Sequence, residues 1–136
     1  MKNLLGIWLD LKQADIISLK NDTERVWTIP SEVDTATPKG GSYSRPKWGI
    51  HDTINEKTFL NRKKQQLREY FQVIADACKD YEYIYIFGPA DTKIHLQEYL
   101  KTKSDFNPSI VAVDSADQMT PRQKIARVKE IYATLP

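Results

Sequence analysis

The sequence predicts an α/β domain built around a mixed five-stranded β-sheet, and three observations support this prediction. Short apolar segments occupy the first 30 residues, a long segment with helical periodicity lies in the middle, and two later apolar runs each precede a helical segment. The chain has 136 residues, of which 40% are hydrophobic. These values fit one domain with its own core, so we expect residues 1–136 to form a single domain.

Three short strands are predicted in the first 30 residues. Residues 4–11 alternate apolar side chains between two faces, and residues 16–20 and 25–29 are short runs of β-forming residues. Residues 12–15 are predicted to form the first turn. Because the connections are short, the three strands are expected to form an antiparallel meander.

The central segment predicts a long amphipathic helix over about residues 57–80. Its apolar side chains recur at helical spacing, while basic and amide side chains occupy the other positions. The apolar stripe consists of Leu60, Leu67, Phe71, Ile74 and Cys78.

The last 55 or so residues predict two strand–helix units. Residues 83–87 and 109–114 are short apolar runs typical of buried strands. Pro89 is predicted in the first turn of the helix that follows the first run, with Asp91 near the positive end of the helix dipole. The last helix is predicted to begin with a capping box whose N-cap is Thr120.

The predicted order of elements is therefore β-β-β-α-β-α-β-α. A meander followed by two strand–helix units favours a sheet with helices on both faces, which is the three-layer ribonuclease H-like architecture. Nucleases, ATPases of the sugar-kinase type and translation proteins all use this architecture, so the fold by itself does not determine the function.

A long basic loop is predicted at about residues 34–55. Residues 37–68 contain eight Lys and Arg residues and two carboxylates, a local net charge of +6 in a chain whose total is +2. Cations interleaved with aromatic rings favour a phosphate backbone and stacked bases, and a glycine pair lets the backbone approach a partner closely. The alternative is a solvated loop whose charges only aid solubility. The predicted nucleic-acid-binding residues are Lys39, Gly40, Gly41, Ser42, Tyr43, Arg45, Lys47, Trp48, Arg62, Lys63 and Lys64.

Three aspartates at strand ends form a second candidate site. Asp10 ends the first strand, Asp91 follows the fourth and Asp114 ends the fifth. Converging carboxylates hold the Mg²⁺ ions of two-metal enzymes, so this alternative is a nuclease or phosphotransferase, and only here is a cofactor expected. The other interpretation is that each aspartate caps a turn or a helix. No Cys/His cluster has zinc-binding spacing, so no other metal site is predicted.

Two further expectations concern location and surface. The apolar run before Asp10 is too short for a signal peptide or a membrane span, so we expect a cytoplasmic protein without a membrane partner. A third hypothesis is a plain interaction domain, in which an exposed Trp27 or Trp48 marks a protein-binding patch.

Two segments share an order of features with a known family. One is an apolar strand that ends in glycine and leads, through a small residue, an acid and a lysine, into a leucine-rich helix; the positions are Gly88, Ala90, Asp91, Lys93 and Leu96. The other is a basic loop, with Gly40-Gly41, that precedes a basic helix. In both, the chain resembles the central domain of the eukaryotic and archaeal class 1 peptide chain release factors and of Pelota. Residues 6–19 also resemble the first hairpin of bacterial proteins related to that domain.

This resemblance implies a ribosomal RNA or tRNA partner. The loop would reach toward the acceptor end of a tRNA, and the basic helix would run along RNA. In the release factors the glycine pair is followed by a glutamine that helps place the hydrolytic water, whereas this chain has Ser42 there. The resemblance therefore implies a ribosome- or tRNA-associated RNA-binding protein without release activity, and leaves open whether any reaction is catalysed.

Overall fold

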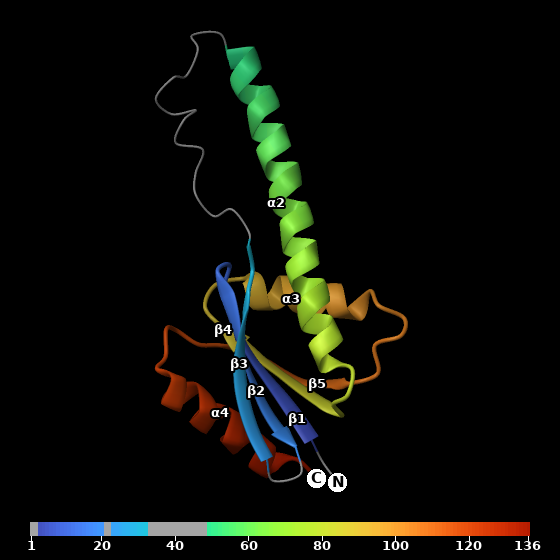
Figure 1. The fold of residues 1–136 in the computed structure, drawn as a ribbon, viewed down its shortest axis with the longest axis vertical. Helices are drawn as coiled ribbons and strands as arrows, with labels where there is room; N and C mark the ends of the chain where they lie inside the picture. Colours follow the sequence, from blue (N-terminus) through green and yellow to red (C-terminus); the bar gives the residue numbers. More distant parts are fainter. Residues whose placement is uncertain (1–2, 21–22, 33–48) are drawn as a thin grey trace.

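The computed structural model describes residues 3–20, 23–32 and 49–136, and in the last range it describes side chains from residue 62 onward. The elements in these ranges are β1 (Asn3–Leu9), β2 (Gln13–Lys20), β3 (Thr23–Pro30), α2 (Gly49–Cys78), β4 (Tyr83–Gly88), α3 (Thr92–Lys101), β5 (Ser109–Ser115) and α4 (Pro121–Thr134). Helices α2 and α3 cover one face of the sheet and α4 covers the other (Figure 1). The predicted α/β class, the five strands and their order with the helices are confirmed.

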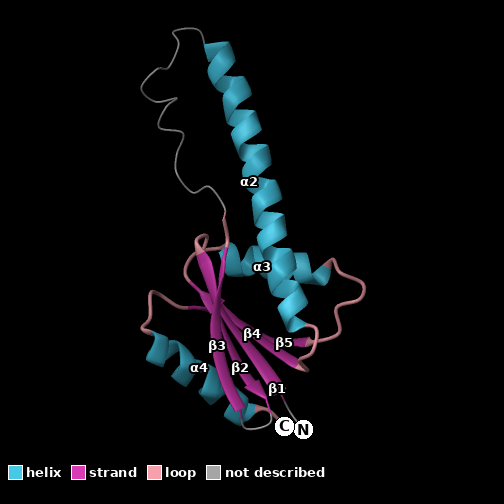
Figure 2. Ribbon diagram, in the orientation of Figure 1, coloured by secondary structure: helices cyan, strands magenta, loops and turns pink. Residues whose placement is uncertain are grey.

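The five strands form one mixed sheet in the order β3-β2-β1-β4-β5 (Figure 2). Strands β1, β2 and β3 pair antiparallel, as expected for a meander, while β4 pairs parallel to both β1 and β5. Strand β1 lies in the middle, and residues 4–9 are all buried because both faces and both edges of this strand are covered.

Strand β1 supplies side chains to two separate cores because successive residues point to opposite faces. Leu5, Ile7 and Leu9 pack in the core under α2 and α3, whereas Leu4 and Trp8 pack in the core under α4. The sheet thus separates the core under α2 and α3 from the core under α4.

Gly6 lets α4 approach the sheet closely. A Cβ atom added at this position would lie 2.3 Å from Cγ2 of Val128 and 2.8 Å from its Cγ1. Val128 is fully buried. The helix can occupy this position only because residue 6 has no side chain.

The predicted first turn at residues 12–15 is wrong, because residues 13–15 already belong to β2. The actual turn is stabilised by Asp10, whose Oδ1 accepts hydrogen bonds from the backbone N–H groups of Lys12 (2.8 Å) and Gln13 (3.0 Å). An aspartate that bonds the backbone two or three residues ahead closes a tight turn. The connection is therefore shorter than predicted and β2 is longer.

The predicted boundaries of the loop and of the long helix are also wrong. Helix α2 begins at Gly49, so residues 49–55 of the predicted loop are helical, and it ends at Cys78. Residues 34–48 of the predicted loop lie outside the described residues.

Helix α3 begins later than predicted. Pro89 precedes it, and Asp91 is its N-cap, without a hydrogen bond from the side chain to the helix. Gly88 and Ala90 have positive φ angles of 152° and 54°, so the chain turns twice before the helix starts. A Cβ at residue 88 would lie 2.3 Å from the carbonyl oxygen of Leu9, which explains the glycine.

The capping box of α4 is confirmed. The Thr120 side chain accepts from the backbone N–H of Gln123 (3.2 Å), and the Gln123 side chain accepts from the backbone N–H of Thr120 (2.9 Å). Within the described part of the chain, no helix has the length and apolar character needed to cross a membrane.

Candidate nucleic-acid interface

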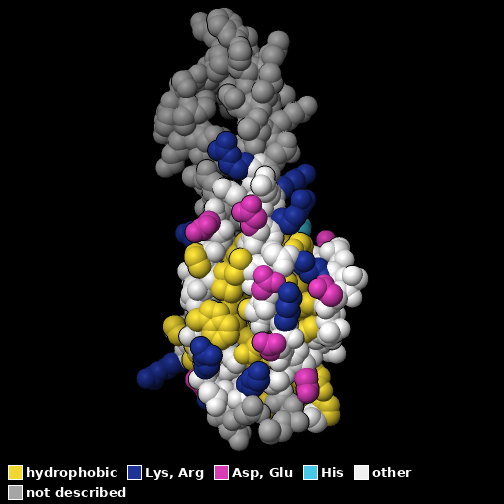
Figure 3. Space-filling view, turned by 45° about the vertical axis from the view of Figure 1, so that its right-hand side comes forward, with side chains coloured by type: hydrophobic (Ala, Val, Ile, Leu, Met, Phe, Trp, Pro, Cys, Tyr) yellow, Lys and Arg dark blue, Asp and Glu magenta, His cyan; other side chains and the backbone are white. Residues whose placement is uncertain are grey.

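Four cations lie on the first part of α2 whose side chains are described. Arg62, Lys64 and Arg68 are exposed, and Lys63 is half-buried. None of them forms an ion pair with a carboxylate of a described residue. On this side of the molecule, blue Lys and Arg side chains gather where the body meets the grey residues (Figure 3). Residues 62–68, called here the basic turn of α2, therefore present positive charge that no described acid neutralises.

The α4 face differs, because three of its cations are matched by the protein's own acids. Nζ of Lys129 lies 2.8 Å from Oε1 of Glu24, and a guanidinium nitrogen of Arg127 lies 3.9 Å from Oδ2 of Asp114. Lys124 also forms an ion pair with an aspartate of β2, and both partners are nearly buried. These three cations therefore differ from the four on α2, none of which has a described carboxylate partner.

Hydrogen bonds and ring contacts hold α2 against the sheet. The hydroxyl of Tyr70 donates to the backbone carbonyl oxygen of Asp10 at 3.0 Å. Burial, together with the nearby negative charge of Asp10, raises the pKa of Tyr70, so this hydroxyl stays protonated and able to donate. The Phe71 ring packs against Tyr99 of α3 with centroids 5.7 Å apart. These contacts fix the direction in which the basic turn of α2 points.

A glutamine connects α2 with α3. The hydroxyl of Tyr99 donates to Oε1 of Gln72 at 2.6 Å, and Nε2 of Gln72 donates to Oδ1 of Asp76 at 2.9 Å. Both groups of the amide are therefore used within the protein. Gln72 thus links α2 to Tyr99 of α3 and to the next turn of its own helix.

The structure describes only part of the predicted interface. Arg62, Lys63 and Lys64 lie together on α2, as the sequence predicted. The remaining predicted nucleic-acid-binding residues lie outside the described residues: Lys39, Gly40, Gly41, Ser42, Tyr43, Arg45, Lys47 and Trp48.

The three aspartates of the alternative site are not brought together as a metal site. Asp10 is used in the β1–β2 turn, and Asp91 is exposed at the start of α3. Asp114 accepts a hydrogen bond from the hydroxyl of Tyr85 at 2.7 Å on the α4 side of the sheet. Among the described residues, no group of three or more His, Cys, Asp and Glu side chains could hold a metal ion. The residues present therefore do not fit the Mg²⁺ site of the enzymatic alternative.

Tyr85 belongs to a small polar network instead. Its hydroxyl donates to Asp114 and accepts from Nε of Arg127 at 3.1 Å. Burial is the main reason that its pKa rises to about 12, and the hydrogen bond to Asp114 adds to this effect. This network ties β4 and β5 to α4.

Sequence reasoning missed one hollow at the surface and one nearly buried ion pair. Lys79 and Lys103, from opposite sides of α3 in the sequence, line one hollow together. Asp15 and Lys124 form their ion pair across 109 residues. Lys103 also lies over the ring of Tyr99, and their separation of four residues could have predicted this contact. The pairing of Lys79 with Lys103 and that of Asp15 with Lys124 depend on how the helices pack.

The fold of this chain is similar to that of a solved translation factor. An archaeal translation termination factor, aRF1, matches with a TM-score of 0.54 and 10% sequence identity over 98% of this chain and 35% of that protein. An identity of 10% shows the fold alone. The described protein therefore has a release-factor-like fold, and it spans about a third of the length of the factor that it matches.

Two further similarities are weaker. A Ppx/GppA phosphatase from Aquifex aeolicus matches with a TM-score of 0.33 and 12% identity over 86% of this chain and 36% of that protein. A second structure of this Aquifex aeolicus family has a TM-score of 0.31 and 14% identity over 90% of this chain and 36% of that protein. These values carry no argument about function. No protein-family model matches the sequence, and no curated protein matches it.

Proposed function

We propose that this protein is a ribosome- or tRNA-associated RNA-binding protein of the release-factor type that lacks release activity. Its basic interface consists of Arg62, Lys63 and Lys64 on α2 together with the preceding segment, residues 34–48. In this proposal the protein acts in the cytoplasm on ribosomal RNA or tRNA.

One observation carries the proposal. The cations on the basic turn of α2 have no described carboxylate partner, whereas Lys124, Arg127 and Lys129 on the α4 face all do. Arginine and lysine side chains that are not neutralised by the protein itself are available to replace the counterions of a phosphate backbone. The likeness to an archaeal translation termination factor makes RNA the polyanion that we favour.

The proposal is tested by filter binding of the protein to tRNA and to ribosomes between 50 and 200 mM salt. Arg62→Gln and Lys64→Gln should each lower the slope of log K against log[salt] by about 0.7 to 0.9, the value of one lost phosphate contact. The same loss is expected for Lys39→Gln and Arg45→Gln in the preceding segment. The matched control is Arg122→Gln, because Arg122 is an exposed arginine on α4. A slope that does not change in the α2 variants would reject this interface.

The absence of release activity needs its own experiment. A purified release assay with ribosomes that carry formylmethionyl-tRNA should give no ester hydrolysis above background, because Ser42 is shorter than the glutamine of the release factors. The Ser42→Gln variant shows whether the side chain alone limits the reaction. Hydrolysis by the unaltered protein would contradict this part of the proposal.

A further inference from the structure

We propose that the RNA contact extends from the basic turn of α2 into the seam between α2 and α3, where Lys103 binds a phosphate of the same strand. This inference rests on the proposed function and adds a second helix and one lysine to the interface. The seam consists of two neighbouring hollows. Their shared wall is Gln72.

The outer hollow continues the basic turn directly. It has a volume of about 560 Å³ and is lined by Lys64, Gln65, Arg68, Glu69, Gln72 and Tyr99. Lys64 and Arg68 are four residues apart and lie on the same side of the helix. A strand that contacts Lys64 on α2 is therefore also beside Arg68 and the start of the seam.

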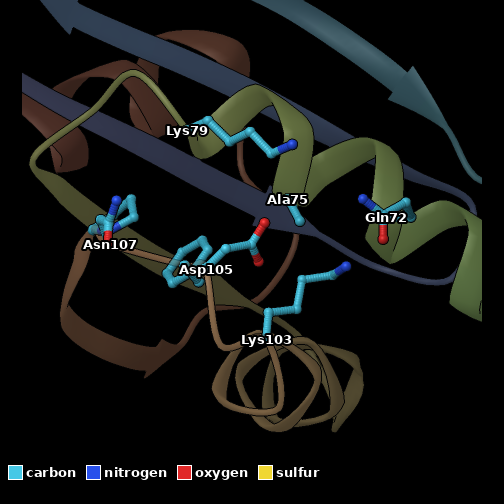
Figure 4. A pocket seen from close by; sticks show the side chains of 8 residues that line it. Gln72, Ala75, Lys79, Lys103, Asp105 and Asn107 are labelled. Atoms are coloured by element: carbon cyan, nitrogen blue, oxygen red, sulfur yellow. The ribbon is translucent and has the colours of Figure 1, made fainter.

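The inner hollow places two lysines from different elements around one space. It has a volume of about 220 Å³, and Lys79 at the end of α2 and Lys103 after α3 are among its lining residues. Figure 4 shows the ammonium group of Lys103 extending toward Gln72, with Asp105 between the two lysines. Lys103 forms no ion pair with a described carboxylate, and its Nζ lies 5.2 Å from the centroid of the Tyr99 ring. The ring holds the cation near the seam without neutralising it.

The length of the seam fits a strand better than a small anion. Lys79 directly follows α2 and comes 15 residues after Lys64, which corresponds to about 22 Å along the helix axis. One strand of a duplex carries one charge per 3.4 Å or so, so this length meets about six phosphates. A single phosphate ion would occupy only one of the two hollows.

The chemistry of the walls favours RNA over a protein partner. Charged and amide side chains dominate the lining, and the exposed apolar side chain of Val73 lines a different hollow, beside β3. Protein interfaces have an apolar core, whereas nucleic-acid interfaces are polar and positively charged. Asp76 does not oppose a phosphate strongly, because it pairs with Lys79 at 3.3 Å and accepts from Gln72.

Substitutions at Lys103 and at Asp105 should change the affinity for tRNA in opposite directions. In filter binding of labelled tRNA, Lys103→Gln should lower the salt slope by about 0.7 to 0.9, so its loss of affinity is about threefold larger at 50 mM than at 200 mM salt. Asp105→Asn removes a negative charge from the same hollow and should strengthen binding at 50 mM salt. General damage to the fold would weaken binding in both variants, and thermal melting of each variant measures such damage directly. Arg122→Gln again serves as the control.

The outcomes separate the two proposals. If the salt slope is lower in Arg62→Gln but unchanged in Lys103→Gln, the RNA contact at the seam is refuted and the contact at the basic turn of α2 stands. Absence of salt-dependent tRNA binding by the unaltered protein would overturn both. Competition by polyglutamate as strong as that by RNA of equal charge would assign the seam to an acidic protein and overturn the RNA contact. Opposite shifts in the Lys103 and Asp105 variants, with RNA as the stronger competitor, would support it.

Discussion

The close approach of α4 to the sheet at Gly6 gives a prediction whose size can be worked out from the structure. In Gly6→Ala, the new Cβ would lie 2.3 Å from Cγ2 and 2.8 Å from Cγ1 of Val128, far inside normal contact distance. Val128 is β-branched and fully buried, so it cannot rotate away freely. We expect the substitution to lower the free energy of unfolding by about 2 to 3 kcal/mol, the usual cost of overpacking a core.

The double variant tests this reasoning more sharply than the single one. Val128→Ala alone should lower the free energy of unfolding by about 2 kcal/mol, because it removes two buried methyl groups and leaves a cavity. In Gly6→Ala/Val128→Ala the new methyl group fills part of that space, so the double variant should be less destabilised than the sum by about 1 to 2 kcal/mol. Urea unfolding followed by tryptophan fluorescence measures all three values. Additive losses would show that the two positions do not touch and would refute the packing described above.

Two further predictions concern polar groups on the α4 face. Lys124→Met should lower the free energy of unfolding, measured in urea, by about 3 kcal/mol, because the nearly buried Asp15 carboxylate would lose its cation. The Lys124 ammonium also lies 3.7 Å from the centroid of the Trp8 ring. A loss under 1 kcal/mol would contradict the importance of the Asp15–Lys124 pair. Tyr85 should ionise near pH 12 instead of pH 10 in an absorbance titration. Because its pKa is raised in the folded state, its contribution to the free energy of unfolding is complete below pH 10 and is lost as the pH rises from 10 to about 12. Tyr85→Phe should reduce this fall in stability.

Much of the fold follows from patterns that are local in the sequence. The alternation in β1 and the apolar runs of β4 and β5 predicted the strands, and the capping box of α4 was found where Thr120 and Gln123 predicted it. The start of α2 was missed because Gly49 and its polar neighbours have low helix propensity. A helix that is stabilised by tertiary packing over its second half can extend through such residues.

The sequence predicted only the part of the candidate site whose charged residues are adjacent in the chain. Arg62, Lys63 and Lys64 are adjacent in the sequence, so their cluster on α2 needed no knowledge of packing. Lys103 joins the same surface only because α3 packs across α2, and the pairing of Asp15 with Lys124 joins residues 109 apart. Both depend on tertiary contacts that no spacing rule predicts.

The two aspartates at strand ends, Asp10 and Asp114, illustrate the opposite error. Their positions fit a metal site in outline, yet each is occupied by a nearby partner: the backbone of the β1–β2 turn for Asp10, and Tyr85 with Arg127 for Asp114. Aspartate satisfies turns and short polar networks more often than it binds metals, and sequence position alone does not distinguish these uses.

The length of α2 has a mechanical consequence. The described apolar contacts of the helix begin at Leu67, so the part from Gly49 to Leu67 extends about 27 Å past that point (Figure 1). A tilt of about 10° at the Tyr70–Asp10 hydrogen bond would displace the far end of such a helix by about 5 Å. A displacement of the far end would therefore act on the packed part of the helix, which is anchored in the core through Tyr70, Phe71 and Ile74.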